Sequence, residues 1–414
     1  MTTTAEPRDY SSSDFLCGPI IGEGRFGSVV YAEHATQEVH DGGVGYKLPR
    51  PQDNQNDGQG YAVKLIPKSE ILRHQLLQAV MTEKRILAEV LSSNQDNDTS
   101  SSSGSAALMI PKLFCCFHDD SYLYFVLELC SGGTMLDLVN HCAKIRRDNS
   151  CNDSISDTPL MDIAWVRYYA GQLVRVLEYI HQKGVIHRDI SPRNILFTSR
   201  GALKLCDFGS AVVIGTSAEG QHLASSRIDN DDFVGTADYV CPETIRGESI
   251  KSGCTGTTSS IFQQNELLGA IDLWSLGCLI FQMSVGESPF HAGSDQGAFQ
   301  RVLDYTNHKS RIHFPPYIDM DVKGLILSLV AIDATSRIGL SDGVVSSKES
   351  KKPYHSLREH KFFTTKDKLQ QQFWTLLENN SIDPPYTPAE QSWMTQLHQS
   401  GWKMKRIEEM CYEL

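Results

Sequence analysis

The sequence has no long apolar run, no hydrophobic leader and no CxxC pair. A membrane-spanning helix needs about 20 consecutive apolar residues, and the 414-residue chain contains no such run. The polar start, MTTTAEPRDYSSS, lacks the apolar core of a secretory signal. We therefore expect a cytoplasmic protein, with access to the nucleus left open. The 11 cysteines are too sparse and irregularly spaced for a disulfide scaffold, so we expect reduced thiols.

Basic residues are also scarce. The formal net charge is −12, and Lys and Arg form no block. This charge disfavours non-specific binding to nucleic acid or to an acidic membrane, and it favours basic protein substrates. With 414 residues, of which 40% are hydrophobic, the chain can bury a large core but exceeds the usual single one. Two lobes with appendages are predicted.

Three polar, low-complexity stretches divide the chain: Pro49–Gly60, Ser92–Ala107 and Arg147–Thr158. Such segments bury too little apolar surface to offset the entropy cost of ordering, so we expect mobile surface loops. Before residue 130 the ordered parts alternate like strands, interrupted by one predicted helix from Ser69 to Val90. After residue 160 helical spacing dominates. This pattern predicts a small strand-rich lobe followed by a larger helical lobe.

The most informative motif is HRDISPRN, at His187–Asn194, followed by CDFG at Cys206–Gly209. Phosphoryl transfer to a hydroxyl uses a carboxylate as base and two oxygen ligands that hold magnesium on the phosphates. Asp189 is the candidate base, and Asn194 and Asp207 are the candidate metal ligands. Either motif alone could arise by chance. Both in this order predict a phosphotransferase.

A glycine-rich stretch, GEGRFGSV, runs from Gly22 to Val29. Glycines let backbone N–H groups approach phosphates closely. One alternative is a hairpin turn with no ligand, and another is a dinucleotide-binding fingerprint, which requires a helix directly after the glycines. Here SVVY continues as a strand, which favours a glycine lid over a nucleotide.

Lys64 ends the apolar alternation YAVK and is a candidate to bind the α- and β-phosphates. A lone strand lysine is usually a solvated surface charge. Glu83 and Glu89 lie on the helix that follows, and either could pair with it. We favour Glu83, because its apolar neighbours place that face of the helix toward the lobe interior.

The stretch GTADYVCPE, from Gly235 to Glu243, has the form Gly-Thr-x-x-Tyr-x-x-Pro-Glu that ends a kinase-type activation segment. Arg188 is a candidate to hold a negative group on that segment. Two further residues are expected to be structural: Asp272 should anchor the backbone of the catalytic loop, and Arg337 should pair with Glu243.

Together these residues resemble a eukaryotic protein kinase domain over roughly residues 14–363, which ends at HKFF. The stretches YAVKLIPKSEIL, CCFHDDSYLYF, DFVGTADYVCPE, VGESPFHAG and LVAIDATSRIG are most similar to the AGC group and, within it, to the 3-phosphoinositide-dependent protein kinase family. The resemblance implies an α+β, two-lobed fold. Residues 14–130 would form a small antiparallel β lobe with one regulatory helix, and residues 131–363 a larger helical lobe.

The flanking segments carry separate expectations. Residues 1–13 are expected to be disordered. Residues 364–414 form a C-terminal extension with an apolar stripe at helical spacing, which predicts an amphipathic helix. The stripe consists of Leu397, Met404, Ile407, Cys411 and Leu414. This extension is too short for a phosphoinositide-binding domain and lacks a hydrophobic motif of its own.

The resemblance also implies the cofactors ATP and Mg²⁺ and the transfer of the γ-phosphate to Ser or Thr, with the activation loops of other AGC kinases as substrates. The implied ATP-binding residues are Ile21, Gly22, Glu23, Gly24, Gly27, Val29, Ala62, Lys64, Leu127, Glu128, Cys130 and Leu196. The family binds the phosphorylated hydrophobic motif of its partners in a groove beside the regulatory helix. The matching groove residues are Lys68, Ile71, Leu72, Leu77, Val80, Lys84, His118 and Leu123.

Three residues depart from the family pattern. Ser191 stands where kinases for Ser and Thr carry a Lys, Arg193 stands where tyrosine kinases often carry an Arg, and Thr134 replaces an acid that binds the ATP ribose. We therefore count Arg193 among the candidate catalytic residues. A tyrosine or dual-specificity kinase and a pseudokinase scaffold stay as alternatives to a Ser/Thr kinase.

The activation segment shows a fourth departure. The family's phosphorylated Ser, directly before Phe-Val-Gly-Thr, is Asp232 here, preceded by Asp231. A carboxylate offers one charge and two oxygens, against about −1.5 to −2 and three oxygens for a phosphate. We expect Asp232 to accept a bidentate hydrogen bond from Arg188 and to order the segment without modification. The alternative is a solvated acidic turn. The residues assigned to this segment are Arg188, Asp232, Thr236 and Glu243.

Overall fold

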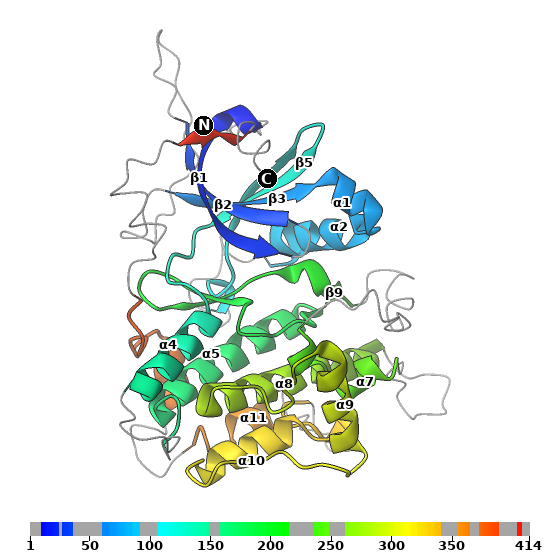
Figure 1. Ribbon diagram of the computed structural model, residues 1–414, viewed down its shortest axis with the longest axis vertical. Coiled ribbons are helices and arrows are strands. Elements are labelled where there is room, and N and C mark those ends of the chain that lie inside the picture. Colours follow the sequence, from blue (N-terminus) through cyan, green and yellow to red (C-terminus); the bar gives the residue numbers. More distant parts are fainter. Residues whose placement is uncertain are drawn as a thin grey trace, which may run out of the picture.

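The computed structural model describes residues 10–24, 27–35, 60–91, 106–148, 158–214, 236–247, 261–340, 354–364, 372–388 and 404–407. They form a small lobe built on one sheet and a larger lobe built of helices (Figure 1). The fold is therefore α+β with two lobes, as the resemblance implies. None of the described helices is long and apolar enough to cross a membrane.

The small lobe is a six-stranded antiparallel sheet with the strand order β10-β1-β2-β3-β5-β4. Alternate side chains point to the same face of a strand. On one face of this sheet, Phe15, Val63 and Tyr124 are fully buried in one apolar cluster. The strands are β1 (Phe15–Gly24), β2 (Gly27–His34), β3 (Tyr61–Pro67), β4 (Leu113–His118), β5 (Tyr122–Glu128) and β10 (Lys405–Arg406).

The N-terminal residues just before β1 are ordered, contrary to the expectation for residues 10–13. Ser12–Asp14 form a 3-10 turn in which Ser11 and Asp14 bond each other's backbone. The ring of Tyr10 lies 6.3 Å from that of Phe15, at the edge of the sheet's apolar cluster. Capping and aromatic packing thus extend the small lobe toward the N-terminus. Residues 1–9 lie outside the described residues.

The helix expected from Ser69 to Val90 is broken in the structure. It consists of α1 (Lys68–Arg73), α2 (Leu77–Arg85) and a π-helical turn at Ile86–Val90. The break lies at Gln75, whose φ of 53° is left-handed and does not continue a right-handed helix. The buried residues of α2 are Val80 and Glu83. This helix therefore presents a carboxylate, as well as an apolar side chain, to the lobe interior.

The large lobe is organised around α5 (Ile163–Gln182) and α8 (Ile261–Val285). Asp162 caps α5 by accepting a hydrogen bond from the N–H of Ala164 at 2.7 Å. Trp274 on α8 is fully buried, as expected for a helix that is apolar around its whole circumference. The other helices are α4 (Met135–Asp148), α7 (Pro242–Ile245), α9 (Asp295–Thr306), α10 (Met320–Leu329), α11 (His355–Arg358) and α13 (Phe373–Glu378).

Two short two-stranded sheets lie where the large lobe meets the small one (Figure 1). The first pairs β6 with β9 and the second pairs β7 with β8. The HRDISPRN stretch connects β6 to β7, and the CDFG stretch connects β8 to β9. Both motifs are therefore held between the lobes. The strands are β6 (Val185–Ile186), β7 (Ile195–Phe197), β8 (Leu203–Leu205) and β9 (Val212–Val213).

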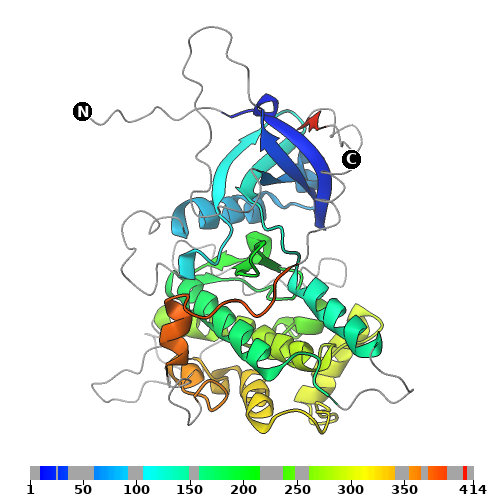
Figure 2. The same cartoon turned by 90° about the vertical axis from the view of Figure 1, so that its left-hand side faces the viewer.

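The C-terminal extension contacts both lobes (Figure 2). Its helix α13 packs on α5 at Gly171, where a Cβ atom would lie 2.8 Å from the ring of Phe373. Further along, β10 pairs with β1, placing Leu16 opposite Arg406. The strand at Lys405–Arg406 contradicts the helical stripe expected through Met404 and Ile407, because edge pairing with β1 satisfies these backbone groups instead. Leu397, Cys411 and Leu414 lie outside the described residues.

The ends of two polar stretches are ordered, unlike the loops expected there. Ala106 and Ala107 are buried in the main core, and α4 extends through Arg147 to Asp148. The rest of the stretches at Ser92–Ala107 and Arg147–Thr158, apart from Thr158, lies outside the described residues, as does Pro49–Gly60 except Gly60.

Candidate active site

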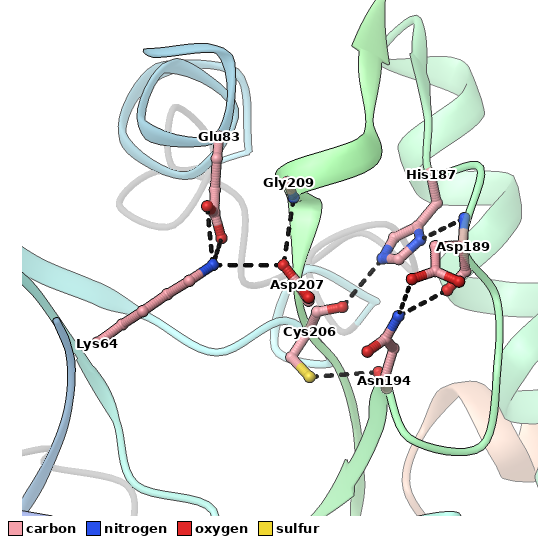
Figure 3. Close-up of polar contacts among 8 residues, drawn as sticks. All are labelled: Lys64, Glu83, His187, Asp189, Asn194, Cys206, Asp207 and Gly209. Atoms are coloured by element: carbon pink, nitrogen blue, oxygen red, sulfur yellow. Dashed lines mark hydrogen bonds and ion pairs between the residues drawn. The ribbon is translucent and has the colours of Figure 1, made fainter. Parts of the chain in front are cut away.

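Lys64, Glu83 and Asp207 meet between the lobes (Figure 3). The Nζ atom of Lys64, on β3, donates to Oε1 and Oε2 of Glu83 at 2.8 and 2.9 Å. It also donates to Oδ1 of Asp207 at 3.3 Å. Glu89, the alternative partner, is exposed and lies 3.9 Å from Arg85. Glu83 is therefore the acid that α2 places against Lys64.

The charges of these three groups depend on one another. Burial acts to lower the pKa of Lys64, but the carboxylates of Glu83 and Asp207 outweigh it and raise that pKa. Burial raises the pKa of Glu83 against the opposing attraction of Lys64. The positive charge of Lys64 holds the pKa of Asp207 below its ordinary value. The site thus keeps one cation and an ionised Asp207, which suits the binding of phosphates and a divalent metal.

Asp189 and Asn194 form the second half of the site (Figure 3). The amide Nδ2 of Asn194 donates to the backbone oxygen of Asp189 at 2.9 Å and to its Oδ2 at 2.8 Å. The other carboxylate oxygen, Oδ1, accepts from the N–H of Thr236 at 3.2 Å. Burial raises the pKa of Asp189, and the hydrogen bond from Asn194 opposes that rise. Its carboxylate is therefore fixed in place and more basic than that of a free aspartate.

The donor set fits a magnesium ion. Because Nδ2 of Asn194 is committed to Asp189, its Oδ1 is the atom left to bind a metal, and Asp207 supplies a carboxylate. Mg²⁺ prefers such oxygen ligands and usually takes only one or two from the protein, the others coming from water and phosphate. Within the described part of the chain, no three His, Cys, Asp or Glu residues are grouped as a metal cluster.

The backbone of the catalytic loop is held by Asp272 on α8. Its carboxylate is fully buried and accepts from the N–H of His187 at 2.9 Å and of Arg188 at 2.8 Å. Arg188 has a φ of 65°, which is costly for a residue with a side chain. Asp272 therefore stabilises a strained backbone directly before Asp189, which is the anchoring role expected for it.

The activation-segment residues are described in part. The guanidinium of Arg188 donates through Nε to the backbone oxygen of Ser210 at 2.6 Å. Asp232 lies outside the described residues, so the expected contact between Arg188 and Asp232 stays a prediction. Glu243 lies 2.5 Å from Nη2 of Arg337, as expected. The buried Arg337 also donates to the backbone oxygen of Ala270 at 2.9 Å, which ties the end of the segment to α8.

The glycine-rich stretch is the hairpin between β1 and β2. Gly24 pairs with Gly27, and β2 continues directly from it. No helix follows, which excludes the dinucleotide-binding alternative. A Cβ atom at Gly27 would lie 2.1 Å from the backbone oxygen of Leu65, so only glycine lets β2 approach β3 here. Gly22 and Glu23 precede the turn on β1.

The apolar residues expected around the nucleotide base lie together. Ala62 is buried in a small cluster to which Ile21, Val29 and Leu127 contribute. Met404, from the C-terminal extension, packs against the same cluster, a contact that its expected place on an amphipathic helix did not predict. Leu196 lies on β7 of the large lobe and forms an isolated β-bridge with Thr134.

Glu128 and Cys130 lie on the segment that connects the lobes. The side chain of Glu128 is paired with Lys204 on β8 at 2.7 Å, while its N–H donates to the backbone oxygen of Lys112 at 2.8 Å. Lys204 is not among the residues expected at this site. Its position between two buried leucines, Leu203 and Leu205, was the available signal, because a buried lysine requires an ionic partner.

The three departures from the family pattern have different structural settings. Thr134 caps α4: its Oγ1 and N–H both donate to Asp137, at 2.7 and 2.8 Å. Ser191 is fully buried, and within the described residues its hydroxyl has no hydrogen-bond partner. Arg193 is exposed beside Asn194. A capping role accounts for Thr134, but nothing in the structure accounts for Ser191.

The expected docking residues surround α1, α2 and β5, at the edge of the small lobe that lies opposite β10. Ile71 and Val80 are buried in a small apolar cluster that Leu123 borders. Leu72 and Leu77 are exposed, at 79% and 59%. The polar members lie at the rim: Lys68 donates to the backbone oxygen of Asp119 at 2.5 Å and lies 3.4 Å from His118, and Lys84 is exposed.

Comparisons with known proteins agree with this geometry. The model of the protein kinase domain matches residues 52–363. The 3-phosphoinositide-dependent protein kinase 1 of Mus musculus is 30% identical over 361 residues, which cover 87% of this chain and 49% of the relative. The protein kinase C eta type of the same organism is 29% identical over 333 residues, or 80% and 38%. The serine/threonine-protein kinase PDK1 of Cryptococcus neoformans is 34% identical over 261 residues, or 62% and 18%.

The family model covers about three quarters of the chain, from residue 52, shortly before β3, to residue 363 at the end of the large lobe. The chain spans about half the length of the mouse relative and less of the other two. The chain belongs to the protein kinase domain family, and within that family it is related to the 3-phosphoinositide-dependent protein kinases.

Proposed function

We propose that this protein is a serine/threonine protein kinase that transfers the γ-phosphate of ATP, bound with Mg²⁺, to hydroxyl groups of proteins. The observation that carries the proposal is the meeting of Lys64, Glu83 and Asp207 in one site. Phosphoryl transfer depends mainly on positioning and on electrostatic stabilisation of the phosphates. Lys64, held by Glu83 beside the ionised Asp207, provides both the positioning and the electrostatic stabilisation.

Each residue has a distinct task in this proposal. Lys64 binds the α- and β-phosphates, and Glu83 fixes the direction of its ammonium group. Asp207 and Asn194 would hold magnesium, which would neutralise charge on the phosphates. Asp189 accepts the hydrogen bond of the substrate hydroxyl and takes its proton, a task supported by its fixed and basic carboxylate.

The base of the nucleotide is expected between Ala62, Val29 and Leu127 on one side and Leu196 on the other. We expect the segment Glu128–Cys130, in which the side chain of Glu128 is paired with Lys204, to border the base. Thr134, which caps α4, offers no carboxylate to the ribose. We therefore expect adenine to contribute more than ribose to the binding of ATP.

The proposed substrates are the activation loops of other AGC kinases, recruited through their hydrophobic motifs. The exposed Leu72 on α1 and Leu77 on α2, with the exposed Lys84 also on α2, support this proposal, because apolar anchors with a basic rim suit a phosphorylated apolar motif. We place these encounters in the cytoplasm.

A tyrosine or dual-specificity kinase is the second candidate, and the specific observation in its favour is the exposed Arg193 beside Asn194. One experiment separates the candidates: incubation with Mg-ATP and a panel of AGC kinase domains, followed by phosphoamino-acid analysis. Phosphoserine or phosphothreonine supports the proposal, and phosphotyrosine supports the alternative. If the wild type transfers no phosphate and cannot be distinguished from Asp189→Asn, the protein is a scaffold that does not catalyse transfer.

A further inference from the structure

A chain of hydrogen bonds leads from the catalytic loop through His181 to Tyr354, the residue before α11. Asp272, which holds the N–H groups of His187 and Arg188, also contacts Nε2 of His181 at 2.8 Å. The opposite ring nitrogen of His181, Nδ1, lies 2.8 Å from the hydroxyl of Tyr354. Tyr354 is 3% exposed. Three elements thus meet here: the end of α5, the middle of α8 and the residue before α11.

The ionised carboxylate fixes the direction of the bond between His181 and Asp272, and that of the bond between His181 and Tyr354 follows where the imidazole is neutral. Burial would raise the pKa of Asp272, but the bonds from His181 and from the loop keep it below its ordinary value, so the carboxylate is ionised and only accepts. Nε2 of His181 must therefore carry a proton. In a neutral imidazole the other nitrogen is then an acceptor, and the tyrosine O–H donates to it. Burial raises the pKa of Tyr354, which keeps that proton in place.

Tyr354 itself is held firmly. Its φ is 67°, and its N–H donates to the backbone oxygen of Gly339 at 3.0 Å. Its ring lies 5.8 Å from that of His181. A left-handed backbone at a residue with a side chain costs about 1–3 kcal/mol and persists only where the surroundings enforce it. The hydroxyl is therefore delivered to His181 by a fixed backbone.

We propose that Tyr354 is a positioning residue for phosphoryl transfer, acting through His181 and Asp272 on the loop backbone that carries Asp189. The inference rests on the proposed kinase function. Without the hydroxyl, Nδ1 of His181 has lost its donor, and the imidazole is free to change tautomer or to tilt. Either change weakens the bond to Asp272, which stabilises the strained backbone at Arg188.

The test is Tyr354→Phe, which keeps the ring and removes only the hydroxyl. A neutral hydrogen bond contributes about 1 kcal/mol, so we expect kcat to fall about 3- to 10-fold, with the KM for ATP unchanged. The matched control is Tyr305→Phe, because Tyr305 also donates to a buried partner, the backbone oxygen of Val330 at 3.3 Å, but is not linked to the loop. It should lose comparable thermal stability and keep its kcat.

Two readouts do not depend on activity. In protein labelled with ¹⁵N-histidine, the His181 ring should show the neutral Nε2–H tautomer, and Tyr354→Phe should abolish that signature; His181→Asn assigns the signal. Hydrogen exchange at the amides of His187 and Arg188 should become faster in Tyr354→Phe only. Unchanged exchange and an unchanged tautomer, or an equal fall of kcat in both variants, would overturn the inference. A wild type without transferase activity would refute the proposed function, while the exchange result would still decide the link to the loop.

Discussion

Lys64 on β3 and Asp207 after β8 form an ion pair of 3.3 Å that joins the small lobe to the large lobe. The phosphates and the metal of the proposed reaction belong at this junction, because it is where the two lobes present opposite charges. We predict that Lys64→Met and Asp207→Asn each lower kcat by at least about 100-fold, since each removes a group that stabilises phosphate charge. Initial rates with saturating Mg-ATP measure this.

The control for these variants is Lys144→Met, which removes an exposed lysine on α4. It should keep wild-type turnover. Circular dichroism and thermal melting should show that the two site variants stay folded, because Lys64 and Asp207 are both partly exposed. Turnover close to wild type in either variant would remove these residues from the reaction.

The second prediction concerns acid and the buried Asp272. Its pKa in the folded state lies below its ordinary value, so the stability it provides is present above about pH 4, the usual aspartate pKa. That stability is lost as the pH falls through the lower, folded-state pKa. Asp272→Asn should therefore lower the free energy of unfolding by about 2–4 kcal/mol at pH 7. The difference from wild type should shrink below about pH 4.

Urea unfolding between pH 7 and pH 3 measures that difference. Asp295→Asn is the control, because Asp295 is exposed at the start of α9; it should change the free energy of unfolding by less than about 0.5 kcal/mol at every pH. A difference for Asp272→Asn that stays constant into acid would mean that its carboxylate is not specifically stabilised in the folded protein.

The third prediction tests the docking groove. A peptide carrying a phosphorylated hydrophobic motif should bind and stimulate activity, and Leu123→Glu should weaken that binding at least about 10-fold, because the charge would enter an apolar site. Leu77→Glu is the safer variant, since Leu77 is 59% exposed and its change should not harm folding. Fluorescence anisotropy with a labelled peptide measures both.

The matched control is Ile145→Glu, at a residue on α4 that is 46% exposed and lies in the other lobe. It should bind the peptide like the wild type. Equal affinity in Leu77→Glu, Leu123→Glu and Ile145→Glu would show that the peptide does not use this surface.

The fourth prediction concerns Asp232, which lies outside the described residues. If its carboxylate replaces the phosphate of related kinases, phosphatase treatment should leave activity unchanged. Asp232→Ala should lose most of it, while Asp232→Ser should become dependent on phosphorylation at that residue. Kinetic assays before and after phosphatase treatment distinguish these cases. Full activity in Asp232→Ala would mean that the acidic residues are a solvated turn.

Local sequence patterns predicted the parts of the molecule that local physics determines. Helix α5 is buried at every residue from Tyr168 to Leu177, and β3 is buried on both faces, so the apolar content of each could be read directly from the chain. The positions of Lys64 and Asp207 could be predicted from motifs, because the chemistry of phosphate binding restricts which residue types can stand there.

The features that the sequence did not reveal depend on contacts between distant residues. The break at Gln75 is a single left-handed residue inside a regular apolar pattern, and nothing in that pattern marks it. Tyr354 reaches His181 from 173 positions further along the chain. Helical spacing at Met404 and Ile407 favoured a helix, but pairing with the edge of β1 determined a strand. Strand formation at an edge depends on its neighbour more than on intrinsic preference.

The fifth prediction follows from that strand. Ile407 is fully buried in the apolar cluster of the small lobe, although it belongs to an extension that is packed on the large lobe at α13. Ile407→Ala should therefore lower the free energy of unfolding by about 2–5 kcal/mol, as expected for truncating a core side chain. Arg406→Ala, at an exposed neighbour on the same strand, should change it by less than about 0.5 kcal/mol.

Removal of residues 404–414 should change both the stability of the protein and its KM for ATP. The variants Ile407→Ala and Met404→Ala separate these two effects. The truncation exposes the edge of β1, which lowers stability, and it removes Met404 from the apolar cluster around Ala62. Because that cluster surrounds the expected position of the adenine, the truncated protein and Met404→Ala should both show a raised KM for ATP. Ile407→Ala should lower stability with a smaller change in KM. If the truncated protein had the stability and the KM of the wild type, the extension would not be part of the small lobe in solution.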